Sequence, residues 1–340
     1  MTGRSTGDRS VADTRRPRAG TRCWQLLIAV PVLLALACGS LFVGVGSLTP
    51  QGLLAGHPDE LLLLRESRLP RLIAILLAGA AMSVAGLIMI HVSRNRFVSP
   101  STAGTTESAS LGVLVATVLF GSASLLAKMA VAAVFALAGT FLFLALLRRI
   151  TYRDMIVVPL LGIMLGGVIS SVTTFFAYRA DLLQTLSVWT SGDFSGVLRG
   201  RYELLWLAGA ITLLGYLYAN RFTVVGLGES FAINLGVDFD RVVNLGLVLV
   251  SVTTSVVVVT VGDIPFLGLI VPNLVTMALG DDLRRVLPVT ALAGAFFVLL
   301  CDVLGRTIRF PYEIPVETVA GVIGSAVFIA LVLKARKKVA

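Results

Sequence analysis

The chain has 340 residues, of which 56% are hydrophobic and only 14% are charged. Soluble domains are about 45–50% apolar and ~25% charged, so this composition excludes an ordinary soluble domain and predicts a polytopic membrane protein. The net charge of +9 does not indicate nucleic-acid binding, because Lys and Arg gather in short clusters between apolar runs. Cys23, Cys38 and Cys301 lie in or beside apolar runs without C-x-x-C spacing, so we expect neither a metal site nor a disulfide.

The amino-terminal region changes character near residue 22. Residues 1–22 are polar, basic and rich in Ser, Thr and Gly, which predicts a disordered tail. The apolar run from about Leu26 to Leu48 is longer than the apolar core of a signal peptide. We therefore expect a retained first membrane helix and one polytopic transmembrane domain over residues 23–340.

The stretch Arg65–Gly112 organises the chain. Its apolar part, Leu72–Ile90, has about 20 residues, enough to cross the ~30 Å hydrocarbon layer. Small residues in its second half let neighbouring helix backbones approach closely, which predicts a helix packed among other helices. These residues are Gly79, Ala80, Ala81, Ser83, Ala85 and Gly86.

Apolar runs predict about ten membrane helices and an all-α fold. The expected ranges are about 26–48, 69–91, 109–120, 127–147, 155–177, 203–218, 242–261, within 262–280, 286–304 and 316–333. The third and eighth are short, and the sequence leaves open whether they cross the membrane fully. Residues 178–202 leave room for a short surface helix, and residues 49–64 are expected to form a loop.

The distribution of Lys and Arg predicts the orientation. An even number of helices places both termini on one side, and that side carries 19 of the 28 Lys and Arg residues. The positive-inside rule then places both termini in the cytoplasm. Helices two to five and seven to ten are related by an odd offset, which predicts an inverted repeat of the kind used by transporters.

Catalytic motifs are absent from the sequence. It has no G-x-x-x-x-G-K-[ST] phosphate loop, no H-E-x-x-H and only two His, so we expect no catalytic residue and no cofactor in this chain. The acidic candidates inside the expected helices are Asp302 and Glu317, both near an external helix end, whereas an ion-coupled carrier usually keeps a charged relay in the membrane. The pattern favours a carrier driven from outside itself over a membrane enzyme.

Four separated segments carry a resemblance to a known family. They are R-L-P-R with R-N-R-F-V-S-P (residues 68–71 and 94–100), LGESFAINLG (227–236), GDIPFLGLIVP (262–272) and CDVLGRTIRFPYEIP (301–315). Over about residues 25–335 the chain resembles the iron-siderophore and cobalamin family of bacterial ABC importer permeases, the FecCD-like family. Many members have Gln and His where this chain has Ile90 and Asn273, and the motif spelling is closer to the branch of petrobactin-type catecholate siderophore importers.

The resemblance implies a non-catalytic ten-helix permease subunit in the bacterial inner membrane, with a ferric siderophore of the catecholate type as substrate. The implied partners are a second permease subunit, identical or related, two cytoplasmic ATPase subunits that carry ATP and Mg, and an extracytoplasmic siderophore-binding protein. Residues 226–240 resemble the segment that couples to the ATPase, and a short amphipathic helix there would dock in a groove of that partner. The coupling candidates are Leu227, Gly228, Glu229, Ala232, Leu235 and Gly236.

The resemblance also points to docking and gating residues. Arginines at the external mouth would attract acidic groups of the binding protein or an anionic ferric siderophore. The docking candidates are Arg68, Arg71, Arg306 and Arg309, and Asp302 and Glu313 are near enough in sequence to neutralise some of this charge. The pathway and gating candidates are Asn95, Ser99, Pro100, Pro272 and Asn273.

Three alternatives stay open at this point. The chain could be a secondary carrier or exporter of small molecules, the arginines could anchor the protein at lipid headgroups, and residues 226–240 could be a plain solvated loop.

Overall fold

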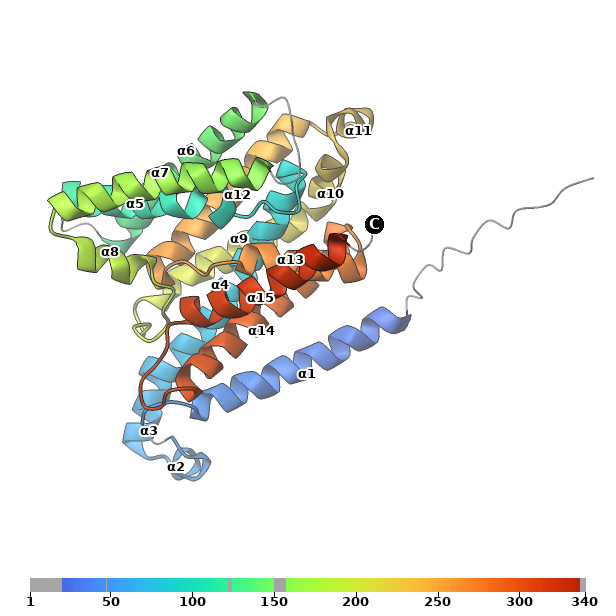
Figure 1. Cartoon of the computed structure of the whole chain (residues 1–340). Coiled ribbons are helices and arrows are strands. Elements are labelled where there is room, and N and C mark those ends of the chain that lie inside the picture. The colour runs from blue at the N-terminus through green and yellow to red at the C-terminus, as the bar shows by residue number, and fades with distance from the viewer. Residues whose placement is uncertain (1–19, 47, 122–123, 150–156, 337–340) are drawn as a thin grey trace, which may run out of the picture.

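Figure 1 shows a bundle of helices in the computed structural model of the chain, which describes residues 20–46, 48–121, 124–149 and 157–336. Within these ranges the regular elements are helices, apart from an isolated bridge between Ser191 and Asp263. The all-α fold predicted from the sequence is confirmed. The predicted tail, residues 1–22, falls mostly outside the described ranges and stays a prediction.

The first membrane helix, α1 (Gly20–Phe42), ends earlier than the predicted Leu48. The cause is local: Gly44 and Gly46 follow with φ angles of 135° and 102°, which no α-helix contains and which glycine adopts without steric cost.

Residues 49–64 do not form the predicted loop. They contain two short helices, α2 (Pro50–Ala55) and α3 (Pro58–Leu63), each with a proline in its first turn, where the missing N–H costs nothing. The Thr49 side chain caps α2, and its backbone N–H donates to the Glu60 carboxylate at 2.9 Å. This hydrogen bond ties α3 back to the start of α2.

The next helix, α4 (Leu69–Ser93), follows α3 through a π-helical turn at Leu64–Arg68, so that Pro58–Ser93 is continuous helix. The 25 residues of α4 alone span about 37 Å, more than the ~30 Å hydrocarbon layer. α2 and α3 therefore project beyond one end of the bundle, which we call the α3 end (Figure 1).

Helix α4 is central, as its small residues predicted. Eighteen of its residues are buried, including nearly all of its second half. At Gly79 an added Cβ would lie 2.7 Å from the Gly294 carbonyl oxygen, and at Gly86 it would overlap the backbone of Gly268. Two neighbouring helices thus pack directly on the backbone of α4.

The second quarter of the chain adds four helices. These are α5 (Thr105–Leu119), α6 (Leu125–Arg149), α7 (Val157–Arg179) and α8 (Leu183–Thr190). α5 is short and begins after Gly104, whose φ is 76°. α8 is the short surface helix predicted between residues 178 and 202.

A bent pair and a short helix follow. α9 (Leu205–Leu217) and α10 (Ala219–Leu227) are inclined by 62° to each other, and α11 (Glu229–Asn234) continues directly from α10. α11 lies at the opposite end of the bundle from α3, and we call this the α11 end (Figure 1).

Four helices complete the chain. They are α12 (Phe239–Val261), α13 (Leu267–Leu279), α14 (Leu283–Thr307) and α15 (Val316–Arg336). α13 is short, like α5, and begins after Phe266, whose φ of 63° is rare for a non-glycine residue. Figure 1 places the start of α1 and the end of α15 on the side of the bundle away from α3.

The predicted number of about ten membrane helices fits the described part of the chain. Five helices are long and apolar enough to cross a membrane, and the bent α9–α10 pair makes a sixth when counted as one span. Four shorter apolar helices lie at Val30–Phe42, α5, α13 and Val316–Leu331.

The packing of the helices is reciprocal. α4 packs along α14 and α13, while α12 packs along α6 and α5, and α4 and α12 touch each other at the centre. If helices two to five correspond to helices seven to ten, α4 corresponds to α12, α5 to α13 and α6 to α14. The observed pairs, and the two short helices that begin after left-handed residues, are those that the inverted repeat predicts.

Candidate functional site

A cluster of five charged residues lies at the α3 end of the bundle. Its members are Arg68, Arg71, Asp302, Arg306 and Glu313, and we call it the arginine cluster. Arg71 donates from Nε and Nη2 to one oxygen of Asp302, at 3.0 and 2.7 Å, and from Nη1 to Glu313 at 2.7 Å. The second oxygen of Asp302 accepts from Arg306. The side chains of Asp302, Arg306 and Arg71 are only 0%, 3% and 11% exposed.

The arginine cluster also holds the chain that leaves α1. Arg68 donates to the carbonyl oxygens of Val43 and Val45, at 2.7 and 2.8 Å. Arg306 donates to those of Ser40 and Val43, at 3.0 and 2.7 Å. Carbonyls at a helix C-terminus lack partners within the helix and attract cations. The cluster therefore fastens α1, α4 and α14 to one another.

This geometry counts against the docking role expected for Arg68, Arg71 and Arg306. All three are buried, and their guanidinium groups donate to acceptors of the same chain, so that they offer no free charge to a docking protein. Asp302 pairs with both Arg71 and Arg306, and Glu313 pairs with Arg71. Arg68 instead donates to backbone carbonyl oxygens. Arg309 is exposed, with its guanidinium 5.8 Å from the ring of Tyr312, and it remains available for docking.

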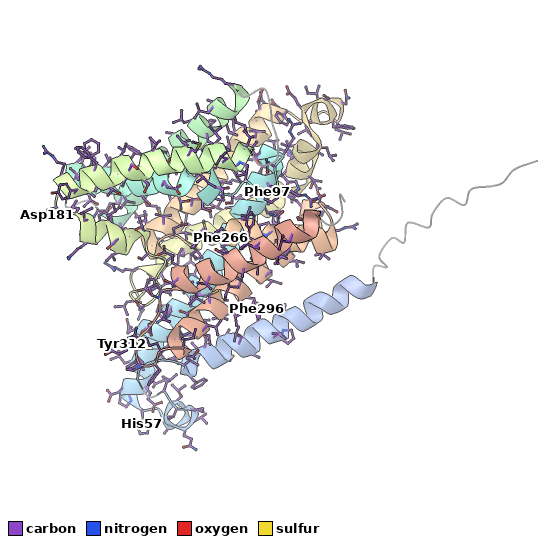
Figure 2. All side chains as sticks on the ribbon, viewed as in Figure 1. His57, Phe97, Asp181, Phe266, Phe296 and Tyr312 are labelled. Carbon is purple, nitrogen blue, oxygen red and sulfur yellow. The ribbon has the colours of Figure 1, made fainter. Side chains whose placement is uncertain are left out.

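Around the arginine cluster, the α3 end exposes apolar and cationic side chains. The exposed apolar residues are Leu54, Leu61, Leu62, Ile308, Phe310 and Tyr312. The exposed arginines include Arg65, Arg201 and Arg309. Figure 2 shows Tyr312 beside α3 and His57 at the tip of the α2–α3 projection. We call this surface the α3-end surface.

At the opposite end, the predicted coupling segment forms the short helix that the sequence predicted. Gly228 and Gly236, with φ of 116° and 71°, flank α11 on both sides. The exposed apolar side chains there are Leu227, Phe231, Ile233 and Leu235, each 61–62% exposed. The predicted helix is confirmed, and its apolar face is turned away from the bundle.

Ala232 has a different position from the one expected. As a coupling candidate it was expected to contact the ATPase, but it is 0% exposed and faces its own chain. Its N–H donates to the Gly228 carbonyl at 3.0 Å, and its carbonyl accepts from Val237 at 2.9 Å. Ala232 therefore seats α11 on α10 and α12, and the exposed apolar residues around it form the contact surface.

The predicted gating residues lie together at the α11 end. The loop between α4 and α5 folds onto α13, and Asn273 Nδ2 donates to the Arg96 carbonyl at 2.6 Å and to Leu269 at 2.7 Å. Pro100 contacts Gly268, where an added Cβ would lie 3.2 Å from its Cδ. Pro272 lies within α13.

Ser99 and Asn95 shape this loop from within. Ser99 is fully buried, and its hydroxyl lies 3.1–3.2 Å from those of Ser101 and Thr102. Asn95 accepts from the Phe97 N–H at 2.9 Å. The five gating candidates thus belong to a buried loop–helix joint, and their role in gating stays a prediction.

Aromatic rings join this loop to the last helix. The rings of Phe97 and Phe328 meet edge to face at 6.0 Å, and those of Phe266 and Phe328 stack at 6.5 Å. Phe97 and Phe266 come from different connections and are drawn in Figure 2. The rings therefore link the loops that precede the short helices α5 and α13.

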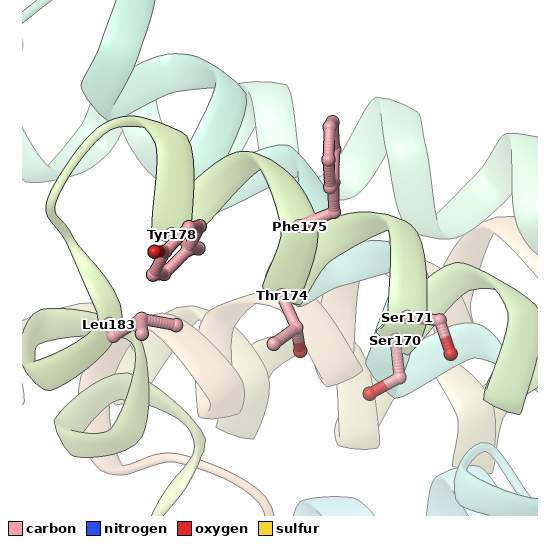
Figure 3. Close-up of a pocket in the computed structure, with 6 residues that line it drawn as sticks. All are labelled: Ser170, Ser171, Thr174, Phe175, Tyr178 and Leu183. Carbon is pink, nitrogen blue, oxygen red and sulfur yellow. The ribbon is translucent and has the colours of Figure 1, made fainter.

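The outward face of α7 carries a hollow of about 500 Å³ (Figure 3). Its lining residues are Ser170, Ser171, Thr174, Phe175, Tyr178 and Leu183. Ser171 donates to the Gly167 carbonyl of its own helix at 2.8 Å. Among the described residues, the hydroxyls of Ser170 and Thr174 have no side-chain hydrogen bond. Polar groups on a membrane helix normally face protein or a water-filled cavity rather than lipid.

Two acidic side chains in the bundle interior were not predicted from the sequence. Glu107 lies in the first turn of α5 and Asp263 in the connection from α12 to α13. Within the described part of the chain, Glu107 Oε2 and Asp263 Oδ1 are buried without a hydrogen-bond partner. Glu107 precedes the expected helix at 109–120, and Asp263 lies in the Gly- and Pro-containing stretch before α13, so neither was placed inside a membrane helix. The described residues hold no group of three or more His, Cys, Asp or Glu placed to bind a metal.

A bundle of about ten apolar helices, with a projecting apolar helix at one end and an extended α2–α3 element at the other, defines a polytopic membrane protein of the permease type. Residues 32–334 match the FecCD transport family. The chain therefore belongs to the FecCD transport family, as its motifs predicted.

Similar proteins support this assignment. The chain is 53% identical over 303 residues to the petrobactin import system permease protein YclN of Bacillus subtilis, covering 89% of this chain and 96% of that one. It is 42% identical over 302 residues to the ferric-anguibactin transport system permease protein FatD of Vibrio anguillarum, with the same coverage of 89% and 96%. A solved structure, described as an inward-facing conformation of a metal-chelate type ABC transporter, superposes with a TM-score of 0.78 at 25% identity and covers 92% of this chain and 99% of that one.

Proposed function

We propose that this chain is the membrane-spanning subunit of an ABC importer that moves a ferric siderophore, of the catecholate type, into the cytoplasm. The observation that carries the proposal is the exposed apolar surface of α11, which lies at one end of a permease bundle. Relatives that are permeases of petrobactin and ferric-anguibactin importers support the substrate class. ATP hydrolysis then belongs to partner subunits, as the absence of a phosphate-loop motif supports.

The proposal includes an orientation. The α11 end faces the cytoplasm and the α3 end faces outward, which places both chain termini in the cytoplasm. The excess of Lys and Arg in loops on the α11 side supports this direction. The chain then lies in the bacterial inner membrane as a multi-pass subunit beside a second permease subunit.

We assign ATPase docking to the exposed face of α11. Exposed apolar side chains of this kind fit a groove on a partner, and Phe231 and Ile233 lie on the two sides of the buried Ala232. Replacing Phe231 with Glu should reduce copurification of the ATPase. Phe310 offers a matched control, because it is 65% exposed against 61% for Phe231 but lies at the other end of the bundle. Equal ATPase recovery with F231E and F310E would contradict the assignment.

We assign docking of the extracytoplasmic binding protein to the α3-end surface rather than to the arginine cluster. Its exposed arginines suit a partner with acidic groups, and its apolar side chains suit a partner with an apolar contact area. Replacing Arg65 and Arg309 together with Glu should weaken association most at low ionic strength, because solvated charge pairs contribute only ~0.2–1 kcal/mol each and are screened by salt. Exposed Arg94, at the α11 end, provides the control. Unchanged affinity at low salt would assign these arginines to lipid headgroups.

We assign the hollow on α7 to the translocation pathway. Its free hydroxyls and its aromatic walls offer weak, neutral contacts along a membrane helix that the rest of the bundle covers only in part. These hydroxyl and aromatic contacts would let the anionic ferric siderophore pass, because no fixed positive charge binds it tightly.

Uptake in whole cells tests the function as a whole. A deletion strain starved of iron should lose uptake of radiolabelled ferric petrobactin, and the wild-type gene should restore it. Depleting ATP should stop uptake, whereas a protonophore given with ATP present should not. Uptake that stops with the protonophore alone would assign a secondary carrier, and unchanged uptake of every ferric siderophore in the deletion strain would overturn the proposal.

A further inference from the structure

The α10–α11 unit is joined to the start of α14 by a side-chain hydrogen bond. The hydroxyl of Thr223 in α10 accepts the backbone N–H of Leu283 at 3.1 Å and donates to the Ala219 carbonyl of its own helix at 3.0 Å. Leu283 is the first residue of α14 and is 0% exposed. The bond therefore crosses between two elements that are 60 residues apart in sequence.

This hydrogen bond completes the cap of α14. The first N–H groups of a helix have no partner within the helix. The side chain of Asp282 accepts from Arg284 at 3.2 Å, and the N–H of Leu283 is satisfied by Thr223. The first turn of α14 is thus capped by α10, the helix that precedes α11. A movement of α10 therefore displaces the start of α14.

A second contact holds the α10–α11 unit against the end of α4. At Gly226 an added Cβ would lie 2.7 Å from Cδ2 of His91, so the imidazole ring packs against the α10 backbone. The ring nitrogens of His91 lie 3.0 Å from the Leu87 carbonyl and 3.4 Å from the Asp281 carbonyl. The carboxylate of Asp281 pairs with Arg96 at 3.0 Å. α10 is therefore held between the end of α4 and the turn that leads into α14.

The far end of α14 carries the arginine cluster. Its 25 residues span about 37 Å, and Asp302 and Arg306 lie in its last two turns. These residues bind Arg71 of α4 and the carbonyls that follow α1. One continuous helix, with Pro288 in its second turn, thus runs from the α11 unit at one end of the bundle to the arginine cluster at the other.

We propose that Thr223 is a positioning residue that couples α11 to α14, so that displacement of α11 by the ATPase reaches the α3 end through α14. The inference rests on the proposed function, because it requires an ATPase at α11. Without the Thr223 hydroxyl, the contact between α10 and α14 is weakened, and a smaller part of the α11 movement reaches α14.

Variants of two threonines separate this role from a structural one. Thr223→Val keeps the shape and removes the acceptor of the Leu283 N–H, while Thr223→Ser keeps the hydroxyl. Thr212→Val in α9 is the matched control. The Thr212 hydroxyl makes the same bond to a carbonyl one turn earlier (2.8 Å to Ala208) and, within the described part of the chain, no bond to another helix.

The first measurement uses the full importer in proteoliposomes, with radiolabelled ferric petrobactin and the binding protein. Thr223→Val should hydrolyse ATP at the wild-type rate and transport about fivefold to tenfold less, a factor that matches the loss of one hydrogen bond to a buried backbone N–H. Thr223→Ser should transport within twofold of wild type, and Thr212→Val should not differ. Wild-type transport per ATP in Thr223→Val would overturn the inference, and so would joint loss of ATPase binding and transport.

The second measurement needs no transported ligand. Spin labels at Glu229→Cys and Thr307→Cys, in a background without the native cysteines, report movement at α11 and at the far end of α14 when ATP binds. We expect both labels to move in the wild-type background and only the α11 label to move with Thr223→Val. Equal movement of both labels in the variant would overturn the coupling role. Normal label movement without uptake of any ferric siderophore would instead overturn the proposed function and leave this inference standing.

Discussion

Replacing Asp302 with Asn should lower the stability of the permease by about 3 kcal/mol, the lower end of the ~3–5 kcal/mol cost of breaking a buried ion pair. Asp302 accepts three hydrogen bonds from two arginines, and its side chain is 0% exposed. The amide oxygen can still accept from one arginine, but Arg306 loses its counter-charge and Arg71 keeps only Glu313. Glu313 compensates Arg71 in part, which is why the lower end of the range applies.

Thermal unfolding of the purified permease in detergent measures this loss. A change of about 3 kcal/mol corresponds to a fall in Tm on the order of 5–10 °C for a chain of this size. Glu66→Gln is the control, because it removes a charge from the same end of the bundle in a pair whose side chains are 42–47% exposed. That exposed pair contributes at most ~1 kcal/mol.

A triple variant separates charge from packing. Arg71→Met, Asp302→Leu and Arg306→Met together replace the buried charges with apolar side chains of similar length and should recover much of the lost stability. A D302N permease that unfolds at the wild-type temperature would refute the reasoning that this carboxylate holds the α3 end together.

Three further predictions follow from the packing and the hollow. Gly86→Ala should place a methyl group against the backbone of Gly268 and cost more stability than the ~1–3 kcal/mol of ordinary overpacking, which should appear as loss of monodisperse protein. Gly167→Ala is the control and should leave the protein monodisperse, because the added methyl group meets nothing within 4 Å. Ala232→Leu should displace α11 and reduce ATPase copurification, whereas Ser230→Leu on the exposed side should leave α11 seated, so equal recovery of the ATPase with wild type and A232L would contradict the buried position. Ser170→Leu with Thr174→Leu should leave Tm unchanged within about 2 °C, because surface changes stay within ~0.5 kcal/mol, and should lower uptake of ferric petrobactin; normal uptake would exclude the hollow from the pathway.

Features set by local sequence could be predicted. The small residues of α4 predicted close helix contacts, and Gly79 and Gly86 make them against backbone. The segment 226–240 predicted a short helix, and α11 forms there between Gly228 and Gly236, whose positive φ angles end a helix. Length and apolarity predicted most membrane helices, since the hydrocarbon layer fixes the number of residues needed.

Features set by distant contacts could not be predicted. The arginines of R-L-P-R were expected at the surface, but Arg71 turns inward because Asp302, 231 residues away, reaches it. Ala232 was expected to face a partner, and only the packing of α11 on its own chain decides its direction. The α2–α3 element was missed because six-residue helices give too few turns for a periodic pattern.

The contact between the α4–α5 loop and α13 could be predicted only in part. Asn95, Ser99, Pro100 and Pro272 belong to two of the sequence motifs, and Asn273 directly follows the second one. The structure brings the two motifs together. The sequence could not show which groups bind each other. Asn273 donates to the backbone carbonyl of Arg96, and a motif, which names side chains, contains no information about such a contact.

The length of chain between Arg71 and Asp302 has a consequence for biosynthesis. The two residues are separated by 231 positions, so at ~5–20 residues per second the ribosome needs roughly 10–50 s to deliver the carboxylate after the arginine. During that time Arg68 and Arg71 sit at the end of a newly inserted helix with no acidic neighbour from α14. Headgroup phosphates are the available counter-charges, and they must be released when α14 arrives. Membranes poor in anionic lipid should therefore slow the maturation of this permease, even where the finished protein is equally stable.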